Sequence, residues 1–118
     1  MNRTPKIRPE LNLSGTSEAE EFQNTVLRPV LKLQHELLLR LIDEYAAQFK
    51  LDVYRGTKET VLEEVTNLVQ KQRSVKATLL GTVIGQFSTA ELEVYLAGRK
   101  EYDKRIQQMI LQRFRDSL

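Results

Sequence analysis

Residues 18 to 49, which read EAEEFQNTVLRPVLKLQHELLLRLIDEYAAQF, decide the fold. Apolar residues recur at steps of three and four from Phe22 to Tyr45, the spacing of one face of an α-helix. Ser17 precedes the stretch with Glu20 three residues later, and this pair is a typical helix start because the serine side chain accepts a hydrogen bond from the first turn. The segment therefore predicts one long helix.

Pro29 lies inside this predicted helix and should disturb it. Proline has no backbone N–H and its ring clashes with the preceding turn, at a cost of about 3 kcal/mol or more in a helix interior. Two outcomes stay open: a kink or break near Val26 to Arg28, or a new helix that begins at Pro29, where the missing N–H does no harm. In both cases we expect the two halves to point in different directions.

The second half of the helix is apolar around much of its circumference. A surface helix usually carries one apolar stripe, so this stretch should be central or at an interface. Because several of the other predicted helices are short, we expect part of it to stay uncovered and to form a homodimer contact. The candidate interface residues are Leu37, Leu38, Leu39, Leu41 and Ile42.

A connection at residues 50 to 56 separates the first helix from the second. Thr57 is the expected N-cap of the second helix, and a third helix should run from Ser74 to Phe87. The apolar face of the second helix consists of Val61, Leu62, Val65, Leu68 and Val69.

Two further helices complete the chain. Ser88 and Glu91 form a capping box ahead of a short helix, which we expect to break at Ala97 and Gly98 through a left-handed turn. The last helix, residues 99 to 118, places apolar residues at steps of four, namely Tyr102, Ile106, Ile110 and Phe114.

Gly81 and Gly85 lie four residues apart on one face of the predicted third helix. Each costs about 1 kcal/mol of helix propensity relative to alanine. Two interpretations stay open. Either another backbone or the Pro29 region approaches this face closely, or the glycines are tolerated in a helix that tertiary packing stabilises.

The predicted fold class is all-α, because no segment of useful length alternates polar and apolar residues. We expect a compact bundle of four to five helices with a long, proline-kinked first helix. Residues 17 to 118 are assigned to a single helical domain. Residues 1 to 16, with two prolines and one glycine, are assigned to an extended N-terminal arm.

Composition and charge limit the environment and the partners. The 118 residues contain no cysteine, which suits a reducing compartment and favours a cytoplasmic protein. No stretch is long and apolar enough to cross a membrane, and no hydrophobic leader follows the N-terminus, so we expect a soluble protein with no membrane partner. The net charge of +2 is too small to identify a nucleic-acid binder.

No chemical motif supports an enzyme. His35 is the only histidine, so no multi-histidine metal site can form, and Lys32 occupies the position where a di-iron protein would need glutamate. Phosphate-binding glycine loops and serine-nucleophile turns are missing. We therefore predict no catalytic residue, no cofactor and no metal, with a small-molecule enzyme of unknown type as the third alternative.

Basic residues on the last helix support a second alternative, a nucleic-acid-binding or regulatory helical module. Acidic residues are interspersed among them, and the aromatic residues of single-strand binders are missing. A solvated charged face is the favoured interpretation, so nucleic acid is an unlikely partner.

Residues 22 to 34, FQNTVLRPVLKLQ, and 81 to 88, GTVIGQFS, resemble a family of small bacterial helical proteins found among Bacteroidetes. The resemblance covers nearly the whole chain after residue 18. It implies an uncharacterised family in which some members carry the automatic label glyoxalase, with no established catalytic residues to transfer. A glyoxalase metal site needs a βαβββ scaffold and several His and Glu ligands, which a helical chain with one histidine does not provide.

If the pattern at residues 22 to 34 marks more than packing, its polar residues form the candidate pocket or partner contact. Arg28, beside the proline, could meet freed backbone carbonyls or a carboxylate and so form an anion-binding or partner-binding pocket. The alternative is that these residues stabilise the kink and fill space. The candidate residues are Asn24, Arg28, Lys32 and Gln34. The function that we predict is association, with a homodimer as its form.

Overall fold

The computed structural model describes residues 17–51 and 56–118, and all regular structure in these ranges is helical. The predicted arm at residues 1 to 16 and residues 52 to 55 of the predicted connection lie outside the described residues. None of the described helices is both long and apolar enough to cross a membrane. The elements are α1 (Glu18–Phe22), the π-helical segment η2 (Gln23–Leu27), α2 (Arg28–Leu33), α3 (His35–Gln48), α4 (Lys58–Lys71), α5 (Arg73–Ile84), α6 (Thr89–Ala97) and α7 (Arg99–Asp116).

The predicted start signals cap three of the helices. The Ser17 hydroxyl accepts from the backbone N–H of Glu20 at 3.0 Å, and the Thr57 hydroxyl accepts from Thr60 at 3.2 Å. The capping box ahead of α6 is complete, because Ser88 Oγ accepts from Glu91 N at 3.1 Å and Glu91 Oε1 accepts from Ser88 N at 2.8 Å. The helix starts were therefore predictable from local chemistry.

The long first segment changes its helical geometry just ahead of Pro29. Residues Gln23–Leu27 have π-helical geometry, in which the Arg28 N–H donates to the carbonyl of Gln23, five residues back. The α geometry resumes at Arg28, so Pro29 is the second residue of α2 and not the first. The wider turn gives the proline ring room against the preceding carbonyls. The predicted change of direction between the two halves stays a prediction.

The boundary between α2 and α3 is slight. Gln34 has φ −95° and ψ 9°, yet its N–H donates to Val30 and its carbonyl accepts from Leu38, both at 2.9 Å. The four-residue hydrogen-bond pattern therefore continues from α2 into α3. α3 ends at Gln48 and is followed by a turn in which Lys50 has a left-handed φ of 59° and Leu51 N donates to Ala46 O at 2.8 Å. This is a Schellman turn with lysine in the place that glycine usually takes, and the sequence carries no signal for it.

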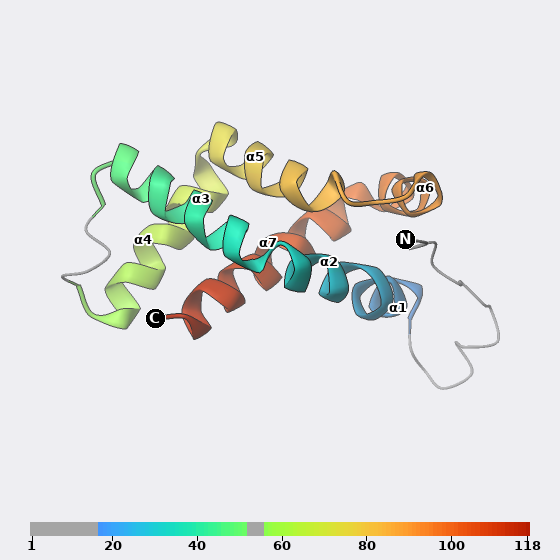
Figure 1. Cartoon of the computed structure of the whole chain (residues 1–118), viewed down its shortest axis with the longest axis horizontal. Helices are drawn as coiled ribbons and strands as arrows, with labels where there is room; N and C mark the ends of the chain where they lie inside the picture. The colour runs from blue at the N-terminus through green and yellow to red at the C-terminus, as the bar shows by residue number, and fades with distance from the viewer. Residues whose placement is uncertain (1–16, 52–55) are drawn as a thin grey trace.

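The buried side chains of these helices form one core. α3 contacts α4, α5 and α7, while α7 also contacts α4, α5 and α6 (Figure 1). Figure 1 shows α3 and α4 at one end of the bundle, α1 and α6 at the other, and α7 running between the two ends. The predicted apolar face of α7 is confirmed, because its residues at steps of four, Tyr102, Ile106, Ile110 and Phe114, are all buried.

An aromatic cluster closes the end of the bundle where α1 meets α6 and α7. The Phe22 ring lies 4.8 Å from the Tyr102 ring and 5.8 Å from the Phe87 ring, and Phe87 lies 5.9 Å from Tyr95, measured between centroids. The Phe22–Phe87 and Phe87–Tyr95 pairs meet edge to face, an arrangement that adds to the stabilisation from burial.

The break between α6 and α7 lies at Gly98 as predicted, but its conformation is not left-handed. Gly98 has φ −131° and ψ 37°. A Cβ atom at this position would lie 3.0 Å from Cε2 of Tyr102, closer than normal packing allows. The approach of the Tyr102 ring, and not a positive φ, favours glycine here, because the ring would have to shift by a few tenths of an ångström to admit a methyl group.

The close approach that we considered for Gly81 and Gly85 is wrong. A Cβ atom built on Gly81 meets no atom within 4 Å, and one built on Gly85 meets only the carbonyl oxygen of Gly81. α5 ends at Ile84, so Gly85 is the C-cap and not an interior residue. Tolerance in a helix that is held by tertiary packing is therefore the correct interpretation.

Replacing Gly81 by alanine should stabilise the protein. The new methyl group has open space, and the unfolded chain loses conformational freedom, so we expect the free energy of unfolding to rise by about 0.5–1 kcal/mol in urea titrations. Gly98→Ala is the matched control and should lower the stability, because its methyl group meets the Tyr102 ring. A loss of stability in Gly81→Ala would contradict the assignment of Gly81 to open surface.

Stability should also fall at alkaline pH because of Tyr95, whose hydroxyl donates to Asp103 Oδ1. Burial raises the pKa of Tyr95 from 10.0 to about 12, with a further contribution from the hydrogen bond and negative charge of Asp103. Below pH 10 both folded and unfolded chains keep the proton, whereas from pH 10 to about 12 only the folded chain keeps it. The unfolded state therefore binds fewer protons in this range, and the free energy of unfolding declines as the pH rises.

Urea titrations at several pH values up to 12 would measure this decline, with Tyr95→Phe as the comparison. The variant should lose stability near neutral pH, by about 1 kcal/mol for the missing hydrogen bond, and should show a shallower alkaline decline. Burial also raises the pKa of Tyr102, which accounts for the decline that persists in the variant. If the free energy of unfolding of Tyr95→Phe declines with alkaline pH as steeply as that of the wild type, Tyr95 does not contribute to the decline.

Candidate functional site

The predicted interface on residues 37 to 42 is mostly covered by the chain itself. Leu38 and Ile42 are 2% and 0% exposed, so they belong to the core and cannot contact a partner. Leu39 and Leu41 are partly buried against the same core. The wide apolar circumference of α3 has an internal cause, since three helices (α4, α5 and α7) contact it. Leu37, at 50% exposure, is the one residue of the set that lies on the surface.

Leu33 is the most exposed of the large apolar residues in the described ranges, at 61%, and the prediction missed it. Leu33 and Leu37 are one turn apart, so they are neighbours on the same side of the helix. Leu41, the next residue in this row, is partly buried. An adjacent row carries alternating charges on exposed residues, Lys32, Glu36, Arg40 and Glu44. We call these two rows together the outer face.

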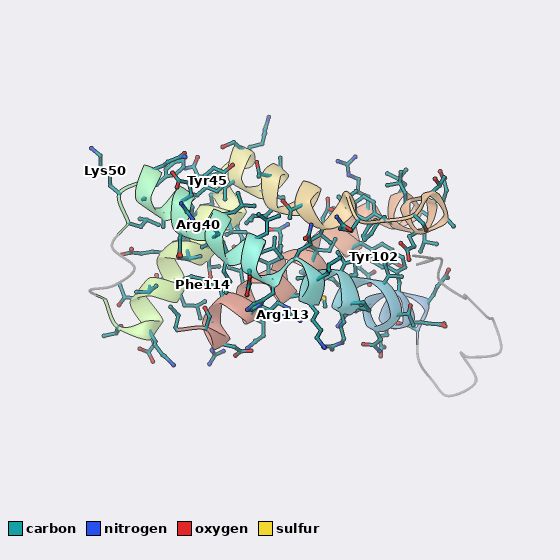
Figure 2. The ribbon with its side chains drawn as sticks, viewed as in Figure 1. Arg40, Tyr45, Lys50, Tyr102, Arg113 and Phe114 are labelled. Atoms are coloured by element: carbon teal, nitrogen blue, oxygen red, sulfur yellow. The ribbon has the colours of Figure 1, made fainter. Side chains whose placement is uncertain are left out.

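Part of this charged row is ordered by an ion pair. Arg40 NH2 lies 3.2 Å from Glu44 Oε1, and the side chains are 67% and 50% exposed. Arg40 and Tyr45, both labelled in Figure 2, belong to α3. The Tyr45 hydroxyl donates to Thr78 Oγ1 of α5 at 3.0 Å. At this exposure the ion pair adds little to stability, so the row is a charge pattern rather than a structural element.

The structure does not bring the four candidate pocket residues together. Arg28 Nε donates to Asn24 Oδ1 at 2.9 Å, one turn away on the same helical segment. Gln34 points elsewhere and donates to the Thr82 carbonyl of α5 at 3.2 Å, while Lys32 is exposed. The expectation that Arg28 meets backbone carbonyls or a carboxylate is wrong, because an amide one turn before it provides the acceptor.

Arg28 nevertheless lines a groove between the first helical segment and α7. The groove has a volume of about 550 Å³. One wall carries Gln23, Arg28 and His35, and the other consists of residues of α7 and its C-cap, including Arg105, Met109 and Arg113. We call this the basic groove. Its three arginines come from two elements that are distant in sequence, and therefore residue spacing alone did not reveal it.

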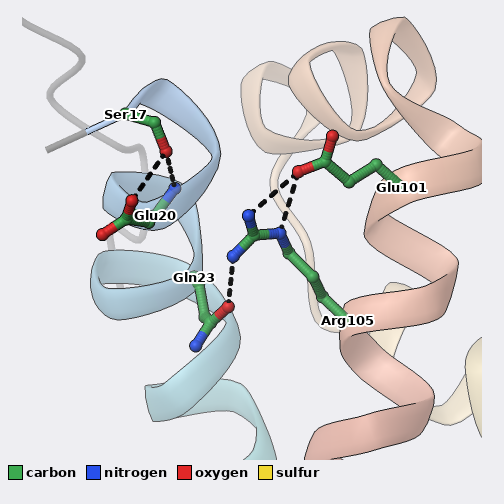
Figure 3. Close-up of polar contacts among 5 residues, drawn as sticks. All are labelled: Ser17, Glu20, Gln23, Glu101 and Arg105. Carbon is green, nitrogen blue, oxygen red and sulfur yellow. Dashed lines mark hydrogen bonds and ion pairs between the residues drawn. The ribbon is translucent and has the colours of Figure 1, made fainter.

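Arg105 holds one end of the groove together (Figure 3). Its Nε and NH2 atoms lie 3.0 and 2.9 Å from Glu101 Oε2, while its NH1 atom donates to Gln23 Oε1 at 2.7 Å. The guanidinium group thus joins the π-helical segment to α7. Its charge is balanced by Glu101, so Arg105 positions the walls rather than attracting a ligand.

His35 and Arg113 meet across the middle of the groove. Arg113 NH1 lies 3.1 Å from His35 Nδ1. Because a guanidinium group can only donate, Nδ1 is the acceptor and the imidazole ring is neutral in this arrangement. His35, the only histidine of the chain, therefore orients an arginine of the groove.

The geometry of the described residues offers no metal centre. No group of three or more His, Cys, Asp or Glu residues lies close enough to hold a metal ion within residues 17–51 and 56–118. The described surface offers groups suited to recognition: apolar and charged side chains on the outer face, and hydrogen-bond donors to anions in the basic groove.

Comparisons with family models, with curated proteins and with solved structures each find no match to this chain. The resemblance to small helical proteins of Bacteroidetes thus stays a prediction. The function must be argued from the surface of the molecule.

Replacing Arg105 by lysine should separate the contribution of the bridge from that of the charge. The planar guanidinium group of Arg105 directs its donors at Glu101 and Gln23 at the same time. The compact ammonium group of lysine cannot contact both residues in this way, so we expect a loss of about 1 kcal/mol in the free energy of unfolding. Arg99→Lys is the control, because Arg99 is 68% exposed and lies 3.8 Å from Asp103. Equal urea midpoints for the two variants would contradict a bridging role for Arg105.

Proposed function

We propose that this protein acts by association and that two copies form a homodimer through the outer face. The observation that carries this proposal is the pair of adjacent leucines, Leu33 and Leu37, exposed at 61% and 50% on one side of a helix. Single exposed leucines are ordinary on protein surfaces, but neighbouring ones beside an ordered charge pattern are typical of contact sites.

The charged row is complementary to a second copy of itself. In a two-fold symmetric contact between antiparallel helices, each row lies against the same row of the other copy. With the axis midway between Glu36 and Arg40, Glu36 faces Arg40 of the second copy, and Lys32 faces Glu44. Every position then meets the opposite charge. The axis also passes within one residue of Leu37, the centre of the leucine row, so one axis serves both rows.

The contact would be small. Residues 32 to 44 cover about 18 Å of helix at 1.5 Å per residue. A contact of this length with two exposed leucines on each side supports a dissociation constant on the order of tens of micromolar, well short of an obligate dimer.

The proposal also covers the cellular compartment and the activity of the protein. We place the protein in the bacterial cytoplasm, on the basis of its cysteine-free sequence and its resemblance to small bacterial proteins, and we assign it no catalytic activity. The bundle is interpreted as a scaffold of four to five helices, with the Pro29 region as a kink that directs the outer face away from the core.

Sedimentation equilibrium at concentrations from 5 to about 500 μM, chosen to span the expected constant, tests the dimer directly. The wild type should approach twice the monomer mass at the upper end, and Leu37→Glu should remain monomeric because the contact would bury its charge. Leu96→Glu is the matched control: Leu96 is 48% exposed on α6, outside the outer face, and should not affect association. A wild type that is monomeric throughout would refute the proposal.

Charge reversal tests the two-fold geometry. Glu36→Arg alone and Arg40→Glu alone should each weaken self-association by about tenfold, because like charges then face each other twice in the symmetric contact. An equimolar mixture of these two variants should recover association, since every position in the mixed pair again meets the opposite charge. Failure of the mixture to recover would reject this axis, even if a dimer forms through another surface.

A further inference from the structure

We propose that the basic groove is a binding site for a small organic oxyanion, a molecule that carries a phosphate or carboxylate group. The site lies between the first helical segment and α7, includes none of the residues of the outer face, and is independent of dimer formation. Two of its arginines, Arg28 and Arg113, are the groups that would bind the anion.

The charges of Arg28 and Arg113 are not balanced by the protein. The ion pairs among the described residues join Arg40 to Glu44, Arg99 to Asp103 and Arg105 to Glu101. Each of these pairs is four residues apart on one helix, so three of the seven described arginines are neutralised by a carboxylate one turn away. Arg28 instead bonds to the neutral amide of Asn24, and Arg113 to the neutral ring of His35.

The contacts of these two arginines leave donors available. Arg28 uses Nε toward Asn24, and Arg113 uses NH1 toward His35, which leaves the terminal NH1 and NH2 atoms of Arg28 and the NH2 atom of Arg113 without a protein acceptor within the described ranges. Asn24 and His35 hold the guanidinium groups in place without cancelling their charge. Two oriented guanidinium groups with unused donors suit the oxygens of a phosphate or carboxylate.

The groove wall carries one acidic residue, Asp116. Gln112 Nε2 donates to Asp116 Oδ1 at 2.9 Å, and because this amide is neutral the carboxylate keeps its charge and offsets one of the three arginines on the wall. The wall also carries the amides of Gln108 and Gln112 and the apolar side chain of Met109. A concave wall with a net positive charge concentrates the electric field and attracts anions.

The shape of the groove favours a compact ligand. A volume of about 550 Å³ is within the range of small-molecule sites. The surface of α7 that adjoins the groove carries Glu101 beside Lys100 and Lys104. A long polyanion lying along α7 would meet the Glu101 carboxylate, and therefore a nucleic acid fits this surface less well than a small anion.

Isothermal titration with inorganic phosphate and, separately, with succinate at constant ionic strength tests the site. We expect saturable binding of at least one anion. The anion with the lower dissociation constant shows whether the site prefers a phosphate or a carboxylate group. Arg28→Gln and Arg113→Gln should each weaken binding by about tenfold, the effect of one lost charged hydrogen bond. Arg115→Gln, with the same charge change on α7 outside the groove, should bind as the wild type does.

The His35→Asp variant tests the site without removing any arginine of the groove. A carboxylate at this position lies beside Arg113 and should compete with the ligand, so binding should weaken about as much as in Arg113→Gln. Circular dichroism and urea titration of each variant would show whether it is folded.

The proposal would be overturned if the folded wild type showed no saturable binding of either anion, if Arg115→Gln weakened binding as much as Arg28→Gln or Arg113→Gln, or if folded His35→Asp bound the anion as the wild type does. A single-stranded oligonucleotide that binds in preference to both small anions would also overturn it, in favour of an extended polyanion surface.

Discussion

The structure depends on the burial of one continuous apolar face, which runs along α1, η2, α2 and α3. Phe22 at one end and Ala46 at the other are both buried, and α7 contacts this segment through Tyr102, Arg105 and Arg113. No single neighbour covers a segment of this length, so α4 and α5 pack beside α3 while α6 and the aromatic cluster close the end near α1. The short helices fit the ends of the bundle because the first segment determines its length.

Pro29 is exposed, but it had to be accommodated in this segment without interrupting the buried face. A proline in regular α-helix clashes with the preceding turn, and the π-helical segment Gln23–Leu27 widens the helix at that point. Val26, Leu27, Val30 and Leu31, on both sides of the change, remain buried. The cost of the irregular geometry is therefore offset by a core that stays continuous across the proline.

The outer face and the basic groove are the two sides of the first segment that its neighbours leave open. The outer face carries leucines because the apolar residues of this segment extend around the helix beyond the side that α5 covers. The groove is polar because α7 approaches this side through Gln23–Arg105 and His35–Arg113, contacts between long side chains that keep the backbones apart. One face is suited to a protein surface and the other to a small anion, and the two are independent in composition and position.

Local chemistry in the sequence determined the all-α class, the N-caps at Ser17, Thr57 and Ser88 and the buried stripe of α7. Caps and stripes depend on residues three or four apart, which one stretch of sequence contains. Tertiary structure alone decided which leucines of residues 33 to 42 are exposed, because three neighbouring helices cover α3 unevenly. It also decided that Arg28 and Arg113 share a groove, since 85 residues separate them and only helix packing brings their side chains to one cavity.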